Sequence, residues 1–328
     1  MSIVISHKTA FNIYSNYRLN KNFVLNEKFQ SILKFKLPHL ISINESNSIR
    51  NFVDMSWLKG KVDYLVNNKN HCIYNDDIKT HYSSLIYPSN SFYKIAKNIY
   101  LVSPELLYYQ LSKSINDVDL MLAGYELCGA YTINRNNDLE LINGIRPLTS
   151  KKRLLLYLQN LKKLNNKCNG FSKAYKIAEQ ILDNSFSPME SRIATMLCSN
   201  RSFGGYGVKN IQLNKPVQLS KGAQNICLKK YVIPDMSSEK IKLAIEYDSD
   251  QFHDNISKNQ DDKLRIDALH HDKWRVFTFV NATTHNFSSL NQLAIDILKY
   301  NKQDTRFSSA KFLQRKRDLY NKVFNNLY

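Results

Sequence analysis

Two short apolar runs in the last third of the chain are neighbours in the sequence, and each ends in carboxylates. The first spans residues 226–233 and is closed by Asp235, and the second spans residues 241–248. Both have the length and the β-branched and aromatic content of strands, and the polar connector at 237–240 is short enough for a hairpin. The sequence therefore predicts an antiparallel pair of strands that brings acidic side chains toward one place.

The acidic side chains of this hairpin suggest a metal site. Side chains alternate along a strand, so Glu246 and Asp248 are expected on one face together with Lys242, while the strand register decides how close Asp235 comes. Like charges at close range repel each other and raise each other's pKa, which does not stabilise a sheet. A hard divalent cation such as Mg²⁺ or Mn²⁺ relieves that repulsion, because it takes oxygen ligands, and it can activate a water molecule against a phosphodiester. The expected metal ligands are Asp235, Glu246 and Asp248.

The order of these residues resembles the PD-(D/E)XK nuclease superfamily. Its two halves correspond here to Pro234-Asp235 and Glu246-Tyr247-Asp248. Asp248 stands where the superfamily has lysine, and this departure resembles the very-short-patch-repair-like endonucleases, in which a histidine follows closely, here His253. The resemblance covers roughly residues 185–300. It implies a restriction-endonuclease-like core, with a mixed sheet flanked by helices.

The resemblance also implies roles for single residues. Asp235 is expected to bind the metal ion, and Glu246 to bind it or to orient the attacking water. Asp248 supplies no positive charge, so a second metal ion or His253 must do so. His253 suits acid–base catalysis because its reference pKa is near neutral, although a structural histidine is the alternative. Glu190 is expected to reach the metal site from the first turn of a helix, where it could instead serve only the helix dipole.

A helix is predicted over residues 256–271, with Leu264 among its core-facing residues. Asp262 and Arg265 are three residues apart and so are neighbours on one face. In the simpler interpretation they form a surface ion pair, whereas the resemblance implies that Arg265 contacts a phosphate. The residues expected to bind nucleic acid are Lys242, Gln251 and Arg265.

The chain carries 46 basic and 28 acidic residues, which gives a net charge of +18. This excess fits a polyanionic partner such as DNA or RNA, because neutralised phosphates release counterions. A compositional bias toward lysine and asparagine would give the same charge without such a partner. The acidic cluster within a basic chain favours nucleic acid, since phosphodiester cleavage requires both.

The cysteines and the hydropathy pattern bear on the compartment. The five cysteines lie far apart, are odd in number and form no C-x-x-C pair, so neither a zinc site nor a disulfide framework is expected. No apolar run approaches the ~20 residues of a membrane span, and the start of the chain has no signal-peptide pattern. We expect a cytoplasmic protein that does not bind a membrane.

A length of 328 residues predicts two domains. Residues 1–184 are expected to form a separate α+β domain, which loosely resembles part of the abortive-infection antitoxin-type proteins and implies no catalytic residues. Residues 185–302 are expected to form the α/β nuclease-like domain, and residues 303–328 a basic helix that is solvated or touches nucleic acid. A homodimer, or a partner protein from a defence or toxin–antitoxin system, is also expected as an option.

Three functions compete on this basis. The first is a metal-dependent endonuclease or nickase that cleaves DNA in defence or repair. The second is a non-catalytic DNA-binding regulator or antitoxin that keeps a nuclease-like fold. The third is an RNA-directed nuclease, because the sequence contains no base-reading module that would separate DNA from RNA.

Overall fold

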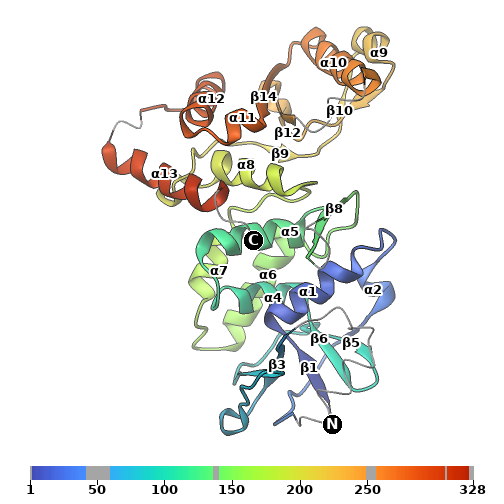
Figure 1. Cartoon of the computed structure of the whole chain (residues 1–328), viewed down its shortest axis with the longest axis vertical. Coiled ribbons are helices and arrows are strands. Elements are labelled where there is room, and N and C mark those ends of the chain that lie inside the picture. The colour runs from blue at the N-terminus through green and yellow to red at the C-terminus, as the bar shows by residue number, and fades with distance from the viewer. Residues whose placement is uncertain (1, 42–59, 136–139, 249–255, 307–308, 325–328) are drawn as a thin grey trace. The chain divides into compact units, whose positions relative to one another are not determined.

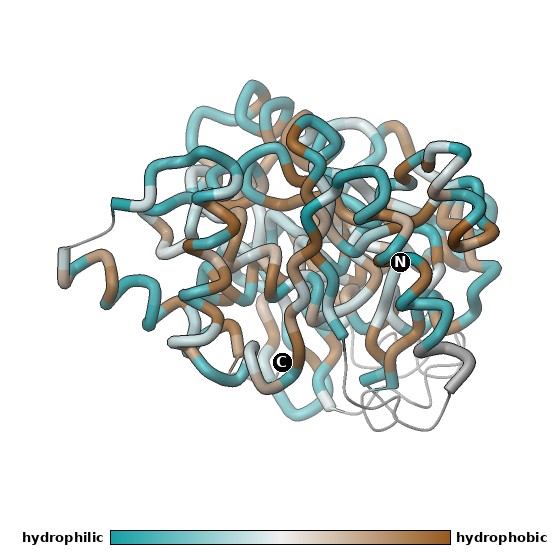
Figure 2. Tube along the Cα trace, turned by 90° about the horizontal axis from the view of Figure 1, so that it is seen from above, coloured by the Kyte–Doolittle hydropathy of each residue, from teal (hydrophilic) through white to brown (hydrophobic). Residues whose placement is uncertain are grey.

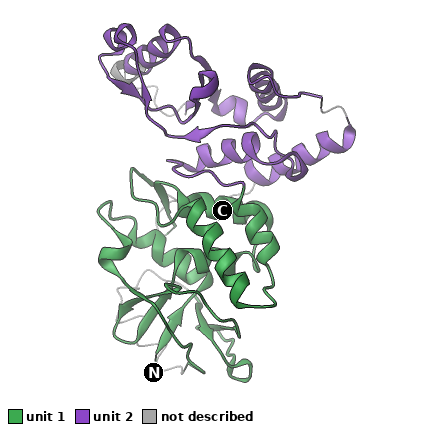
Figure 3. Ribbon diagram, turned by 180° about the vertical axis from the view of Figure 1, so that it is seen from behind, with its two compact units in different colours: residues 1–179 green, residues 180–328 purple. Residues whose placement is uncertain are grey.

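The computed structural model describes residues 2–41, 60–135, 140–248, 256–306 and 309–324. The chain divides into two compact units, Met1–Glu179 and Gln180–Tyr328 (Figure 3). The domain boundary expected from the sequence, after residue 184, lies slightly later in the chain than the boundary between these two units. Both units combine helices with a mixed sheet, so the chain is an α/β protein.

The first unit is built on a six-stranded mixed sheet with the order β2-β5-β6-β1-β3-β4 (Figure 1). The central strand β1 runs parallel to β6 and antiparallel to β3, and β3 runs parallel to β4. Apolar residues dominate β3 and β6, and every residue of β3 is buried. The strands are β1 (Ile3–Ile5), β2 (Gln30–Ile32), β3 (Val62–Val66), β4 (Ile78–Tyr82), β5 (Phe92–Ala96) and β6 (Ile99–Val102).

Helices and a small hairpin complete the first unit. Helix α4 begins as its sequence indicates, because Ser103 Oγ accepts the backbone N–H of Leu106 and Pro104 occupies the first turn. Hydrophobic and hydrophilic residues alternate along many of the helices (Figure 2), as amphipathic packing requires. The elements are α1 (His7–Tyr17), α2 (Leu25–Lys28), η1 (Lys69–His71), α4 (Pro104–Leu111), α5 (Asp117–Cys128), β7 (Tyr131–Asn134), β8 (Glu140–Asn143), α6 (Lys151–Leu164) and α7 (Phe171–Ala178).

The second unit is built on a four-stranded mixed sheet with the order β14-β13-β12-β9. Strands β13 and β14 are parallel, and the other neighbours are antiparallel. Helix α10 is the crossover between β13 and β14, and it covers residues 256–271 as predicted. The sheet strands are β9 (Gln212–Leu213), β12 (Met236–Ser238), β13 (Leu243–Asp248) and β14 (Arg275–Val280).

The remaining elements of the second unit are helices and a separate two-stranded antiparallel sheet, in which α9 connects β10 to β11. Ser187 caps α8 by accepting the backbone N–H of Glu190, in agreement with the sequence. The elements are α8 (Pro188–Cys198), η2 (Arg201–Phe203), β10 (Val217–Gln218), α9 (Lys221–Cys227), β11 (Tyr231–Val232), η3 (Glu239–Ile241), α11 (Asn281–Thr284), α12 (Phe287–Tyr300) and α13 (Ala310–Phe324).

The predicted hairpin exists, but the prediction of its first strand was wrong. Residues 226 and 227 belong to the last turn of helix α9. This helix begins where Ser220 Oγ accepts the backbone N–H of Ala223. Only Tyr231–Val232 is a strand, and it pairs with β10. The strand that pairs with β13 is β12, which begins directly after Asp235. Its serines are small enough to be buried in the sheet, and the turn comes later, in η3 and the left-handed Lys242.

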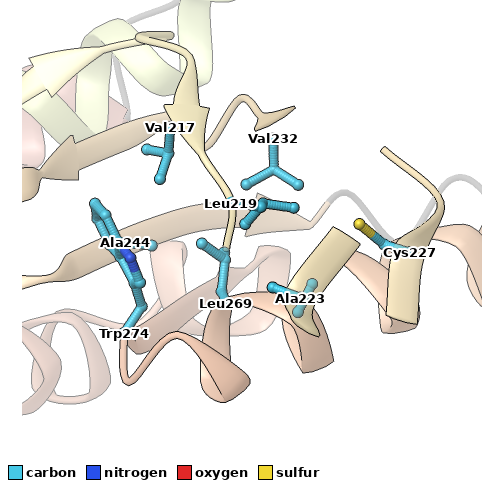
Figure 4. Packing of buried hydrophobic residues seen from close by; sticks show 9 residues of the cluster. Val217, Leu219, Ala223, Cys227, Val232, Ala244, Leu269 and Trp274 are labelled. Carbon is cyan, nitrogen blue, oxygen red and sulfur yellow. The ribbon is translucent and has the colours of Figure 1, made fainter. Parts of the chain in front are cut away.

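A hydrophobic cluster fixes α9 and α10 against the sheet (Figure 4). Leu219 and Val232 come from the short hairpin region, Ala244 from β13, and Leu269 and Trp274 from the end of α10 and the residues after it. Leu264, expected in the core, is largely exposed instead. The cluster fixes the turn of α10 that carries Arg265 beside the end of β13.

The basic helix expected within residues 303–328 is α13, and it belongs to the second unit. Its apolar side packs beside α8, with Leu319, Val323 and Phe324 buried. Across the described ranges, no helix has the length and apolar character needed to cross a membrane.

Candidate acidic site in the second unit

Asp235 and Glu246 face each other at one end of the β12–β13 pair. Met236 opposes Ile245, so the next pair outward is Asp235 and Glu246, whose side chains share a face of the sheet. The backbone N–H of Asp235 lies 3.4 Å from Oε2 of Glu246. The backbone N–H of Tyr247 donates to Oδ2 of Asp235 at 2.7 Å. The register therefore brings together two of the three acids that the sequence singled out as metal ligands.

Glu190 reaches this region from the first turn of α8. Its Oε2 accepts the backbone N–H of Phe186 at 2.8 Å and the side-chain amide of Asn214 at 2.6 Å. Glu190 is buried, and its charge raises the pKa of Asp235. Glu190 therefore lies in the positively polarised first helical turn and its charge acts on Asp235, while its contact with a metal ion stays a prediction.

Asn214 is a site residue that sequence reasoning missed. It follows β9 in a left-handed conformation, with φ at +48°, which asparagine tolerates better than most residues. Its backbone N–H donates to the carbonyl of Asp235 at 3.0 Å, and its side-chain amide also reaches the carbonyl of Asn184. Asn214 thus connects the α8 and β12 parts of the site. A turn-forming asparagine after a short apolar segment was the available signal.

Arg265 approaches from α10 and is the cation of the site. Its Nη2 lies 2.8 Å from Oε1 of Glu246, and its Nη1 lies 3.2 Å from Oδ1 of Asp262. The buried Nε of Arg265 has no hydrogen-bond partner within the described residues. The expected Asp262–Arg265 pair is present, and the same guanidinium also points into the acidic site. Whether it contacts a phosphate stays a prediction.

Burial makes the site's carboxyls weak acids. Burial and then the charge of Glu190 raise the pKa of Asp235 to about 7. The hydrogen bond from the Tyr247 N–H and the charge of Arg265 lower it in part. The pKa of Glu246 is raised to about 7 by burial and then by Asp235, against Arg265. Burial also raises the pKa of Glu190, and the charge of Glu246 adds to that rise. Near neutral pH Asp235 and Glu246 are therefore partly protonated, and a bound cation would displace those protons.

Not every predicted residue joins this group. Asp248 lies at the exposed end of β13, two residues beyond Glu246. Lys242 lies before the opposite end of the strand, about 13 Å from Glu246 along the chain, and its Nζ donates to the carbonyl of Asp272. Lys242 was expected on one strand face with Glu246, but it is left-handed and precedes β13, and its contact with nucleic acid stays a prediction. Gln251 and His253 lie outside the described residues.

The donors available for a metal ion are carboxylate oxygens, which suit Mg²⁺ or Mn²⁺. Within the described chain, no group of three or more His, Cys, Asp or Glu side chains has an arrangement that could hold a metal ion. Asp235 and Glu246 fit as two oxygen donors, and Asp248 is the expected third. The site thus fits the ion in part.

No family model matches the chain, and neither the curated proteins nor the solved structures include a match. The function is therefore argued from the chemistry of the acidic site.

Proposed function

We propose that the second unit, with a restriction-endonuclease-like core, is a metal-dependent endonuclease that hydrolyses or nicks DNA in defence or repair. The observation that carries the proposal is the pair of half-buried Asp235 and buried Glu246, opposed at the ends of neighbouring strands and both with a pKa raised to about 7. Such a concentration of buried acid does not stabilise a sheet by itself. It matches the demand of a site that binds a divalent cation beside a phosphodiester.

The residues divide the chemistry between them. Asp235 and Glu246, with Asp248, would hold Mg²⁺ or Mn²⁺, which when bound supplies an activated water and stabilises charge on the phosphate. Glu190 adds negative charge behind Asp235 and is oriented by the amide of Asn214. Arg265 balances part of that charge and can turn its guanidinium toward a phosphate oxygen, because its side chain is partly exposed.

A second candidate is a DNA-binding regulator or antitoxin without catalysis. The specific observation in its favour is that Arg265 already pairs with Glu246 and so supplies a cation from within the chain. In that case Arg265 does what a metal ion would otherwise do. The positive net charge serves DNA binding equally well in both candidates.

Nicking of a supercoiled plasmid tests the proposal. Wild type should nick with Mg²⁺ or Mn²⁺ and not with EDTA, and Asp235→Asn and Glu246→Gln should each lower the rate by at least about 100-fold. Asp296→Asn, which alters an acid on α12, is the control and should keep full activity. Nicking that survives Asp235→Asn would remove the assignment of this site.

Two further measurements separate the alternatives. Cleavage of RNA in preference to DNA by the wild type, lost in Asp235→Asn, would identify the RNA-directed nuclease. Tight binding of DNA with no cleavage in either metal would favour the regulator.

A further inference from the structure

An exposed apolar and basic surface leads directly into the acidic site. It consists of Leu228, Lys229, Lys230, Tyr231 and Ile233, and we call it the 228–233 rim. Leu228 is 88% exposed and Tyr231 is 48% exposed, although both are large hydrophobic residues. Val232 and Pro234, between and after them, are buried. The rim therefore carries side chains that the core does not use.

The fold gives no reason for these side chains. Leu228 ends α9 in a left-handed conformation, with φ at +55°, a position that favours glycine or asparagine. The hydrophobic cluster beneath the rim is filled by Cys227 and Val232 instead. A leucine that is both strained and exposed contributes little to stability, and exposed apolar groups beside a site commonly mark a binding surface.

One ion pair joins the rim to α10, the helix that also carries Arg265 of the acidic site. Lys229 Nζ lies 3.8 Å from Asp261 on α10, and the next residue, Asp262, pairs with Arg265. Leu264, one turn after Asp261 on α10, is also exposed. Along the chain, Tyr231 precedes Asp235 by four residues, or about 13 Å when extended. This length corresponds to roughly four stacked nucleotides of one strand.

We propose that the 228–233 rim binds an unpaired DNA strand and leads it to the acidic site. Tyr231 offers a ring for base stacking, Leu228 and Ile233 offer apolar contact to bases, and Lys229 and Lys230 neutralise the backbone. This combination of aromatic and basic side chains suits single strands, whose bases are accessible, better than duplexes. The lysines interleaved with the apolar residues favour a polyanion over an apolar face of another protein. The inference rests on the proposed function and names the substrate of that site.

Fluorescence anisotropy in EDTA tests the inference apart from cleavage. The probes are labelled dT20 and a 20-base-pair duplex of mixed sequence, at a fixed salt concentration. Wild type should bind dT20 at least about ten-fold more tightly than the duplex. Tyr231→Ala should weaken dT20 binding by about 5- to 100-fold, the range for loss of one stacked base. Tyr231→Phe keeps the ring and should stay within about two-fold of wild type.

A matched control and a second variant make the outcome decisive. Leu156→Ala removes an exposed leucine from α6 of the first unit and should leave dT20 binding unchanged, while Leu228→Asn, suited to the left-handed backbone, should weaken it. Equal affinity of wild type for dT20 and duplex, or unchanged dT20 binding by both Tyr231→Ala and Leu228→Asn, would overturn the inference. If the protein nicks plasmid but fails this binding test, the nuclease proposal stands and the single-strand inference falls. If it binds single strands but never nicks, the single-strand inference stands and the nuclease proposal falls.

Discussion

Arg265 and Glu246 form a half-buried ion pair at 2.8 Å across the interface between α10 and β13. The same carboxylate accepts the backbone N–H of Asp235 through its other oxygen. One glutamate therefore joins the cation of the site to the acid on the neighbouring strand. The charge balance of the whole site depends on this junction, and the predictions below follow from it.

Replacing Arg265 should destabilise the protein in a pH-dependent way. Arg265→Gln leaves Glu246 beside Asp235 without its cation, so we expect a loss of about 1–3 kcal/mol in unfolding free energy at pH 8. The loss should be smaller at pH 5, where Glu246, with its pKa raised to about 7, is protonated. Urea denaturation at both pH values measures this. Arg306→Gln, whose pair with Asp304 is exposed, should change the unfolding free energy far less, and an equal cost for both variants would contradict the assignment.

Neutralising Asp235 should stabilise the metal-free protein at pH 8. The folded-state pKa of Asp235, about 7, lies above its ordinary value of 3.8, so the folded state holds the proton more tightly. The stability that this proton contributes is complete below pH 4 and is lost as the pH rises through 7. Asp235→Asn should therefore match wild type near pH 4 and exceed it by about 2 kcal/mol at pH 8 in EDTA. A variant less stable than wild type at pH 8 would show that burial and the neighbouring acids do not destabilise the Asp235 carboxylate.

Mg²⁺ should raise the melting temperature of the wild type. For a dissociation constant on the order of 1 mM, 10 mM Mg²⁺ contributes about 1.4 kcal/mol, or roughly 3 °C in Tm for a protein of this size. Asp235→Asn and Glu246→Gln should show no such rise, because each removes a donor oxygen. Differential scanning fluorimetry against NaCl of equal ionic strength measures the difference. The metal assignment fails if the rise persists in both variants.

Removing the Asn214 side chain should loosen Glu190. Asn214→Gly keeps the left-handed backbone and its N–H to Asp235, but it deletes the amide that Glu190 accepts. We expect a loss of about 1–2 kcal/mol in unfolding free energy at pH 8, because a buried carboxylate loses a hydrogen bond. Asn210→Gly is the control, since Asn210 is also left-handed. A similar cost at both positions would indicate a general glycine effect in place of a site effect.

Local sequence signals predicted many elements of the second unit well. The Ser187 cap and Pro188 mark the start of α8, and residues 256–271 and 275–280 form α10 and β14. The stripe of Ile193, Met196 and Leu197 on α8, at helical spacing, is buried. These features depend on caps and on apolar periodicity, which act between residues close in sequence.

The sequence by itself determined that Asp235 and Glu246 belong to one hairpin and that residues 256–271 form the helix that carries Arg265. Only the tertiary structure decided which strand pairs with β13, that Lys242 lies away from the acids, and that Asn214 orients Glu190. The first strand was misplaced because the apolar run at 226–233 suggested one strand, whereas the cap at Ser220 begins helix α9, which includes residues 226 and 227. Strand register and contacts between distant segments arise from packing of the whole unit, because no local propensity distinguishes a buried serine strand from a polar turn.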